Sequence, residues 1–296
     1  MWLADQWNDY EVIDCSKGEK LERWGDYLLV RPDPQVIWDT PKKEKGWRKM
    51  NGHYHRSSKG GGEWEFFQLP KEWTIEYSLP INKKLTFHLK PFSFKHTGLF
   101  PEQAANWNWF SQLIADAVSK GRQVKVLNLL AYTGRATLAA AAAGASVTHV
   151  DASKGMVTWA KENAISSGLK DAPIRWLVDD CVKFVEREIR RGNHYDAIIM
   201  DPPSYGRGPK GEIWKIEESV YPLIQLCSQI LTDNPLFFLI NSYTTGLQPA
   251  VLSYMISTVL GTANGTVTAS EIGLPVSSNG LVLPCGASGR YEATGI

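Results

Sequence analysis

An acid, two prolines and an aromatic residue follow a short apolar run in this chain, and they are strong candidates for chemistry. The run occupies residues 197–200, and after it come Asp201, Pro202, Pro203, Ser204 and Tyr205. Neither a strand nor a helix continues through the prolines, because they fix φ and lack N–H donors. Open α/β sheets bind ligands at the carboxyl ends of their strands, where the Asp201 carboxylate can accept a hydrogen bond from an amine and the Tyr205 ring can stack on a base. Taken alone, these residues also fit a rigid loop with a buried aromatic side chain.

A second set of polar residues follows another apolar run upstream. Residues 124–130 are mostly apolar, as in a strand buried on both faces, and they lead into Ala131, Tyr132, Thr133, Gly134 and Arg135. An alanine-rich stretch ended by Gly144 comes next, which predicts a strand, a tight turn and a helix. The strand predicted over residues 146–150 ends at Asp151, about 17 residues after Gly134, close to the spacing at which an acid meets ribose hydroxyls in a βαβ unit.

The turn after the first of these strands argues against a dinucleotide. It has one glycine, Gly134, where a dinucleotide fingerprint has three, so its backbone cannot approach a whole pyrophosphate. A ligand without phosphates asks less of the turn. The N-terminus of the alanine-rich helix can still attract a carboxylate through its free N–H groups and its dipole.

A third predicted strand, over residues 174–178, ends in two acids and a cysteine, which are Asp179, Asp180 and Cys181. Asp180 is placed to accept a hydrogen bond from an adenine amine, with the Cys181 N–H available to a ring nitrogen. Alternatively, one of the two acids caps the helix predicted over residues 182–191.

Together, these strand ends resemble those of the class I S-adenosylmethionine-dependent methyltransferases, and in detail the bacterial group related to 23S ribosomal RNA methyltransferases. The matching segments are LNLLAYTGRATLAA, THVDASKGMVTWAKENA, WLVDDCVKF and AIIMDPPSYGRG, and the likeness spans roughly residues 90–296. The resemblance implies an α/β fold with a Rossmann-like, mostly parallel seven-stranded sheet, and S-adenosyl-L-methionine (SAM) as the cofactor. The cofactor-binding residues that it implies are Tyr132, Thr133 and Gly134 for the methionine part, Asp151, Ala152 and Ser153 for the ribose, Asp180 and Cys181 for the adenine, and Asp201 beside the methyl group.

The segment over residues 94–103 resembles the short stretch that precedes the catalytic core in this group and closes over the cofactor. The resemblance suggests Gly98, Phe100 and Gln103 as cofactor neighbours. An aromatic ring such as Phe100 or Tyr132 would attract a sulfonium by a cation–π interaction. The alternative is that Phe94 and Phe100 are core residues that join two domains.

One departure from the group bears on the reaction. Cytosine C5 methyltransferases need a cysteine thiolate that adds to the ring, and in this group it follows a late strand. The matching residues 238–245 contain no cysteine, and the four cysteines of the chain are Cys15, Cys181, Cys227 and Cys285. A nitrogen acceptor needs only alignment and loss of a proton, which points to Asp201, Pro202 and Tyr205 as catalytic residues and leaves an oxygen acceptor open.

Composition and charge fit a cytoplasmic enzyme. The chain has 296 residues, 43% of them hydrophobic, and the sequence shows neither a signal peptide nor an apolar run long enough to span a membrane. The cysteines lack paired metal spacing, and His53 and His55 are expected to face solvent, so no metal site is predicted. The net charge of +1 does not by itself demand a nucleic acid.

Two local clusters combine cations with tryptophan. Lys42, Lys43, Lys45, Arg48 and Lys49 surround Trp47, as a stacking and phosphate-binding surface or as a solvated loop. Arg207, Lys210 and Lys215 with Trp214 follow the proline turn. The second cluster is closer to the proposed acceptor, which makes Tyr205, Arg207 and Lys210 the predicted substrate-binding residues.

Two domains are predicted. Residues 1–90 contain short apolar runs, among them 27–30, 35–38, 64–68, 74–77 and 85–89, typical of a small β-rich domain, and residues 91–296 form the methyltransferase domain. Predicted strands over 267–272 and 280–283 resemble the closing antiparallel hairpin of the family. The predicted function is SAM-dependent methylation of a base nitrogen in RNA, ribosomal RNA first. The alternatives are a protein or small-molecule methyltransferase and a non-catalytic SAM-binding interaction protein, and the oligomeric state stays open.

Overall fold

The computed structural model describes residues 1–92, 94–208 and 210–295, and a large mixed sheet is its centre. The strands of this sheet are β1 (Trp2–Leu3), β9 (Lys125–Leu129), β10 (Ser146–Asp151), β11 (Ile174–Val178), β12 (Ala197–Met200), β15 (Phe237–Ser242), β16 (Gly265–Pro275) and β17 (Val282–Ala293). Their order is β1-β16-β17-β15-β12-β9-β10-β11. The strands from β15 to β11 pair in parallel, whereas β17 is antiparallel to β15 and β16. The predicted α/β sheet is confirmed, and β1 extends it at one edge.

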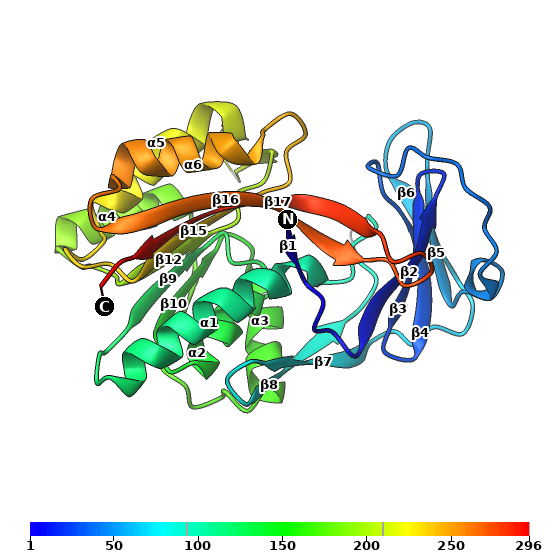
Figure 1. The fold of residues 1–296 in the computed structure, drawn as a ribbon, viewed down its shortest axis with the longest axis horizontal. Coiled ribbons are helices and arrows are strands. Elements are labelled where there is room, and N and C mark those ends of the chain that lie inside the picture. Colours follow the sequence, from blue (N-terminus) through cyan, green and yellow to red (C-terminus); the bar gives the residue numbers. More distant parts are fainter. Residues whose placement is uncertain (93, 209, 296) are drawn as a thin grey trace.

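Helices cover both faces of this sheet (Figure 1). On one face lie α1 (Ala104–Ser119), α2 (Arg135–Ala142) and α3 (Lys154–Ser166), and on the other lie α4 (Cys181–Arg191), α5 (Ile216–Ser228) and α6 (Pro249–Leu260). Strand β12 is apolar throughout because its side chains are buried on both faces of the sheet. Ile199 packs in the hydrophobic core on one face, and Ile198 packs in the core on the other. Burying such a side chain completely contributes about 1.5–3 kcal/mol.

A second, smaller sheet precedes the large one in sequence. Its strands, in spatial order, are β2 (Tyr10–Ser16), β3 (Glu19–Trp24), β4 (Tyr27–Pro32), β5 (Gly52–Arg56) and β6 (Gly62–Phe66). Figure 1 shows it at the right of the molecule, reached by the far end of the β16–β17 hairpin. There the Ser277 N–H donates to the Val12 carbonyl at 2.9 Å. The predicted β-rich N-terminal region is therefore present.

The hairpin of β7 (Trp73–Leu79) and β8 (Lys83–Leu89) packs on the helices of the large sheet rather than on the small sheet alone. The His88 N–H donates to the Asn163 side chain at 2.8 Å, and the Trp159 indole donates to the His88 carbonyl at 2.9 Å. The domain division at residue 90 stays a prediction, and these contacts tie the last strand before it to α3.

One prediction for the N-terminal region is wrong, and one of two alternatives is excluded. Residues 35–38 do not form a strand. The carbonyls of Val36 and Trp38 instead accept hydrogen bonds at 2.7 Å from the tight turn between β2 and β3. The sequence analysis did not predict these two strands. Trp47, in the short 3-10 helix η1 (Lys45–Trp47), offers no stacking surface. It is buried, and its indole N–H donates to Asp14 Oδ2 at 2.9 Å.

No helix in the part of the chain that the structure describes has the length and the apolar character needed to cross a membrane.

Candidate active site

The carboxyl edge of the large sheet has a reversal of strand order between β9 and β12, because β10 and β11 follow on one side and β15 on the other. Such a switch point leaves a crevice in which open α/β sheets bind ligands. A small cavity lies there, lined by side chains from β9, α2, β12 and β15 and from the segment before α1. Its polar lining residues are Gln103, Asn128, Arg135, Asp201 and Asn241.

The loop between β9 and α2 is held in an unusual backbone conformation. Leu130 and Tyr132 have φ of 55° and 54°, and Gly134 has φ of 82°. Residues other than glycine rarely adopt such positive φ angles, and the backbone strain persists only where the surrounding structure enforces it. At Gly134 a Cβ would lie 2.7 Å from the Cβ of Ala160. The single glycine predicted to matter in this turn is thus required by φ and by the approach of α3.

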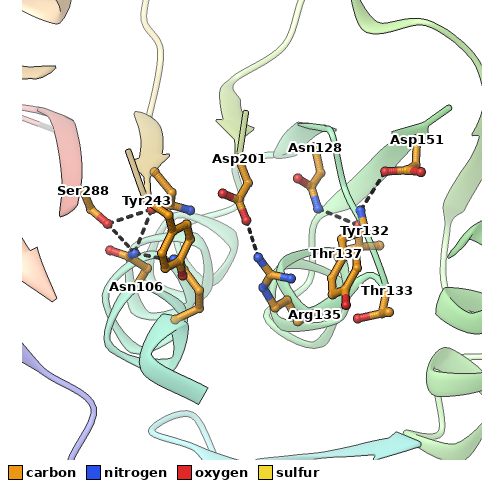
Figure 2. Close-up of polar contacts among 12 residues, drawn as sticks. Asn106, Asn128, Tyr132, Thr133, Arg135, Thr137, Asp151, Asp201, Tyr243 and Ser288 are labelled. Carbon is orange, nitrogen blue, oxygen red and sulfur yellow. Dashed lines mark hydrogen bonds and ion pairs between the residues drawn. The ribbon is translucent and has the colours of Figure 1, made fainter. Parts of the chain in front are cut away.

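Asp151, at the end of β10, is one of those enforcing contacts. Its Oδ1 accepts from the Tyr132 N–H at 3.0 Å (Figure 2), and its Oδ2 accepts from the Ser153 N–H at 2.9 Å. Burial raises the pKa of Asp151, while the two N–H donors lower it. Each carboxylate oxygen keeps a further lone pair, so the side chain can hold the loop and still accept hydrogen bonds from a diol.

The two acids after β11 both have structural partners. Asp180 is the N-cap of α4 and accepts from the Lys183 N–H at 2.9 Å, while Asp179 forms an ion pair with Arg187. Asp180 therefore caps the helix, which is one of the two roles that the sequence left open. Its side chain is exposed, and its second oxygen has no hydrogen-bond partner among the described residues. Cys181 is buried, and burial raises the pKa of its thiol to about 12.

The segment before α1 lies against the β9 loop, as the sequence predicted for Gly98 and Phe100. The Thr133 hydroxyl donates to the Gly98 carbonyl at 2.6 Å, and the Phe100 ring lies 5.5 Å from that of Tyr132. Gly98 has φ of 100°, and a Cβ there would lie 2.2 Å from the Trp159 ring. By contrast, Phe94 is 62% exposed, so the alternative of a core residue is wrong at that position.

An arginine that the sequence analysis did not single out occupies the centre of the site. Arg135, the first residue of α2, forms an ion pair with Asp201, and its Cζ lies 4.9 Å and 5.2 Å from the ring centroids of Phe100 and Tyr132 (Figure 2). Its Nη1 is buried and has no hydrogen-bond partner in the part of the chain that the structure describes. Burial raises the pKa of Asp201, and Arg135 opposes that rise. The ion pair therefore helps to keep Asp201 charged in a largely buried place.

Tyr243 is a second residue that the sequence analysis missed. It follows β15, and its hydroxyl accepts from Gln103 Nε2 at 2.7 Å, while its ring lies 5.5 Å from Phe100. Behind Gln103, Asn106 Nδ2 donates to Asn241 and Ser288 at 3.1 Å and 2.9 Å. Figure 2 shows this network beside Asp201. The same reasoning that selected polar residues after β9, β10, β11 and β12 would have found Tyr243 after β15.

The chain after Asp201 leaves the sheet and forms a hairpin of β13 (Tyr205–Arg207) and β14 (Ile213–Lys215). Tyr205 is 52% exposed, and its hydroxyl accepts from Arg207 Nε at 3.0 Å. The Trp214 indole donates to the Pro203 carbonyl at 2.7 Å. The alternative of a buried aromatic side chain is therefore wrong for Tyr205, whose ring is open to a ligand.

Within the described residues, no group of three or more His, Cys, Asp or Glu side chains is arranged to hold a metal ion. His53 Nε2 lies 2.6 Å from Glu19 Oε2, and the centroid of its ring lies 3.9 Å from that of His55, with the two rings tilted by 33°. This pair therefore has a structural explanation in the small sheet.

The strand order, the antiparallel last strand and the acids at the carboxyl edge define an α/β enzyme that binds a nucleoside-containing cofactor. A family model described as S-adenosylmethionine-dependent methyltransferase matches residues 63–216. This chain belongs to that family, and its cofactor is SAM.

Two curated relatives carry the name ribosomal RNA large subunit methyltransferase K/L. The one from Pseudoalteromonas atlantica is 27% identical over 257 residues, covering 76% of this chain and 33% of the relative. The one from Shewanella oneidensis is 31% identical over 246 residues, covering 78% and 31%. This chain thus spans about a third of the length of these relatives.

A solved structure of a SAM-dependent methyltransferase from Agrobacterium tumefaciens is similar over nearly the whole chain. It is 36% identical, with a TM-score of 0.88, and the match covers 97% of this chain and 91% of that one. The N-terminal sheet and the methyltransferase sheet therefore occur together in another member of the family.

Proposed function

We propose that this chain methylates a base nitrogen of RNA, with ribosomal RNA the first acceptor to test. The observation that carries the proposal is the edge formed by Asp201 and Tyr205. A largely buried carboxylate is followed four residues later by an exposed aromatic ring and then by the cations of the β13–β14 hairpin. The names of the curated relatives support the same acceptor. An enzyme with this acceptor would work in the cytoplasm.

The cofactor site combines loops from three strands. We assign the methionine part to Tyr132, Thr133 and Gly134, with Gly98, Phe100 and Gln103 across from them. We assign the ribose to Asp151, Ala152 and Ser153, and the adenine to Asp180 and Cys181. Two observations fit SAM: the rings of Phe100 and Tyr132 already attract a cation, the Arg135 guanidinium, and both Asp151 oxygens can accept further hydrogen bonds. The bound cofactor supplies an electrophilic methyl group on a sulfonium.

The state of the cysteines favours nitrogen over carbon C5. Cys15, Cys181 and Cys227 are buried, and Cys285 lies in β17 with its thiol directed to the Leu283 carbonyl at 3.4 Å. Burial raises the pKa of Cys15 to about 11 and that of Cys181 to about 12. A nucleophilic cysteine needs a lowered pKa, so these thiols are unsuited to attack a pyrimidine ring.

The roles of the catalytic residues follow from their surroundings. Oδ2 of Asp201 is engaged by Arg135, which leaves Oδ1 to accept a hydrogen bond from the acceptor amine and to orient its lone pair. Pro202 is buried and has no N–H, so its backbone donates no hydrogen bond at this turn. Tyr205 offers its ring for stacking, and Arg207 and Lys210 lie on the same hairpin for phosphate contacts.

The test measures transfer of labelled methyl from SAM into extract of cells that lack the protein. We expect label in a fraction that ribonuclease destroys, and none with Asp201→Ala that still binds SAM. Label that resists ribonuclease but is lost to protease, or that stays in small molecules, would overturn the RNA assignment while keeping the methyltransferase.

A further inference from the structure

A row of aromatic side chains, one half-buried and two exposed, lies at the small sheet, away from the catalytic residues described above. Trp64 and Phe66 are two residues apart on β6, and their rings are parallel within 7°, with centroids 6.0 Å apart. Phe66 is 55% exposed, and the neighbouring Phe94 is 62% exposed. Large apolar rings are costly to expose to water, so a cluster of this kind calls for a ligand.

The two faces of this edge of the sheet differ in charge. On the face of the aromatic row, paired positions of β5 and β6 carry Gly52, Tyr54, Arg56, Gly62, Trp64 and Phe66. The reverse face carries Glu63 and Glu65, opposite His55 and His53. The aromatic face therefore has an exposed cation, Arg56, and no carboxylate among the residues that these two strands contribute.

A lysine adds positive charge at the same place. Lys95 follows Phe94, and its Nζ donates to the Pro32 carbonyl at 2.9 Å. Burial and the charges of nearby cations, among them Arg31 and Arg56, lower the pKa of Lys95 to about 8, while Asp33 opposes them. Lys20 and Arg31 are paired with Asp33 and Glu22, which leaves Lys95 and the exposed Arg56 as the cations that favour an anionic ligand over a neutral or cationic one.

The segment that carries Phe94 and Lys95 also connects the face to the cofactor loop. On the small sheet, the Trp64 indole donates to the Phe94 carbonyl and Arg31 donates to the Lys95 carbonyl, both at 2.9 Å. A few residues later, the Gly98 carbonyl accepts from Thr133 in the β9 loop. Lys95 and Gly98 are three residues apart, so at most about 11 Å of backbone separates the face from the contact with the cofactor loop.

We propose that Phe66, Trp64 and Phe94, with Arg56 and Lys95, form a binding track for single-stranded RNA that leads the acceptor strand to the methyl-transfer edge. The inference rests on the proposed RNA function and specifies where that RNA binds. Bases stack on flat rings whatever their sequence, and the adjacent cations contact phosphates. Duplex RNA keeps its bases paired and unavailable, so the track selects unpaired strands.

The experiment measures binding of a short fluorescent oligouridine to the full chain by anisotropy. We expect Phe66→Ala combined with Phe94→Ala to weaken binding about tenfold, the loss typical of one stacked base. Arg56→Ala should reduce the salt dependence of binding by about one phosphate contact. Tyr254→Ala is the matched control, since Tyr254 is 73% exposed on α6, and it should bind as the wild type does.

Methyl transfer to RNA is measured with the same variants, so that the two proposals can fail separately. If the track binds the acceptor, the Phe66→Ala and Phe94→Ala double variant should have a higher KM for RNA than the wild type. Its kcat and its SAM affinity should be unchanged. If the wild type methylates RNA and the double variant binds oligouridine equally well, the track is refuted and the RNA function stands. Equal losses in Tyr254→Ala would also refute it. If the wild type neither binds oligouridine nor labels RNA, but labels protein, both proposals fall.

Discussion

The loops after β9 and β12 leave neighbouring strands of one sheet and are built in opposite ways. The β9 loop is closed: Thr133 is fully buried, Asp151 holds the Tyr132 N–H, and α3 leaves no room for a side chain at Gly134. The β12 loop begins at the largely buried Asp201 and ends on the surface at Tyr205. A site that binds one invariant cofactor can be rigid and packed, whereas a site for a large acceptor has to be open.

The largest effect is expected from adding a methyl group on the closed side. Gly98→Ala places a Cβ 2.2 Å from the Trp159 ring at a φ of 100°, and we expect it to lower the free energy of unfolding by about 3 kcal/mol and to weaken SAM binding. Chemical denaturation and calorimetry measure the two effects. Gly121→Ala is the matched control, because Gly121 has φ of 89° and nothing within 4 Å of an added Cβ. Equal losses in both variants would show that backbone strain alone, and not packing against Trp159, is responsible.

A substitution on the open side should lower turnover rather than weaken SAM binding. Asp201→Asn keeps the shape of the side chain but removes its charge and leaves Arg135 without its anionic partner. We expect kcat to fall about a hundredfold, the usual scale for a group that acts in proton transfer, with SAM affinity changed only a few-fold. A variant that turns over normally would remove Asp201 from the mechanism.

Arg135 links the two loops and should control the pH dependence. Burial raises the pKa of Asp201, so the carboxylate is protonated at a higher pH than an ordinary Asp, and activity that needs the charged form falls as the pH drops through that pKa. Because Arg135 lowers this pKa, Arg135→Met should raise it and move the acidic limb of kcat to higher pH. At neutral pH we expect Arg135→Met to lower kcat about tenfold.

The pH profile of Arg135→Met separates this effect from general damage. A uniform drop at all pH values, with the acidic limb unmoved, would mean that Arg135 positions Phe100 and Tyr132 rather than tuning Asp201.

The polar residues at the strand ends were predictable on both sides, for one physical reason. The carboxyl ends of parallel strands meet at one edge, so apolar runs that end in polar residues were enough to place Asp151, Asp180 and Asp201. Strands β11 and β12 have the predicted bounds, because apolar runs flanked by acids leave little choice. The roles of these residues stay predictions, and the structure adds that Asp180 also caps α4.

What the sequence did not predict depends on contacts between distant residues. Arg135 and Asp201 are 66 positions apart, and Gln103 and Tyr243 are 140 apart, so no local pattern links them. The exposure of Phe94 was missed for a related reason. An aromatic residue is usually buried, and only the position of the segment on the small sheet shows that this ring stays outside.

The smallest effect is expected at the tip of the open side, where Tyr205 stacks on the acceptor in our proposal. Tyr205→Ala should raise KM for RNA about tenfold, because a stacked base contributes about 1–3 kcal/mol, and it should leave SAM binding unchanged. Tyr205→Phe keeps the ring and loses only the hydroxyl that accepts from Arg207, so its KM should rise by no more than a few-fold. Steady-state kinetics on an RNA acceptor distinguish the two variants. If Tyr205→Phe loses as much as Tyr205→Ala, the hydroxyl and its bond to Arg207 are what matter, and the hairpin positions the acceptor by polar contacts instead of by stacking.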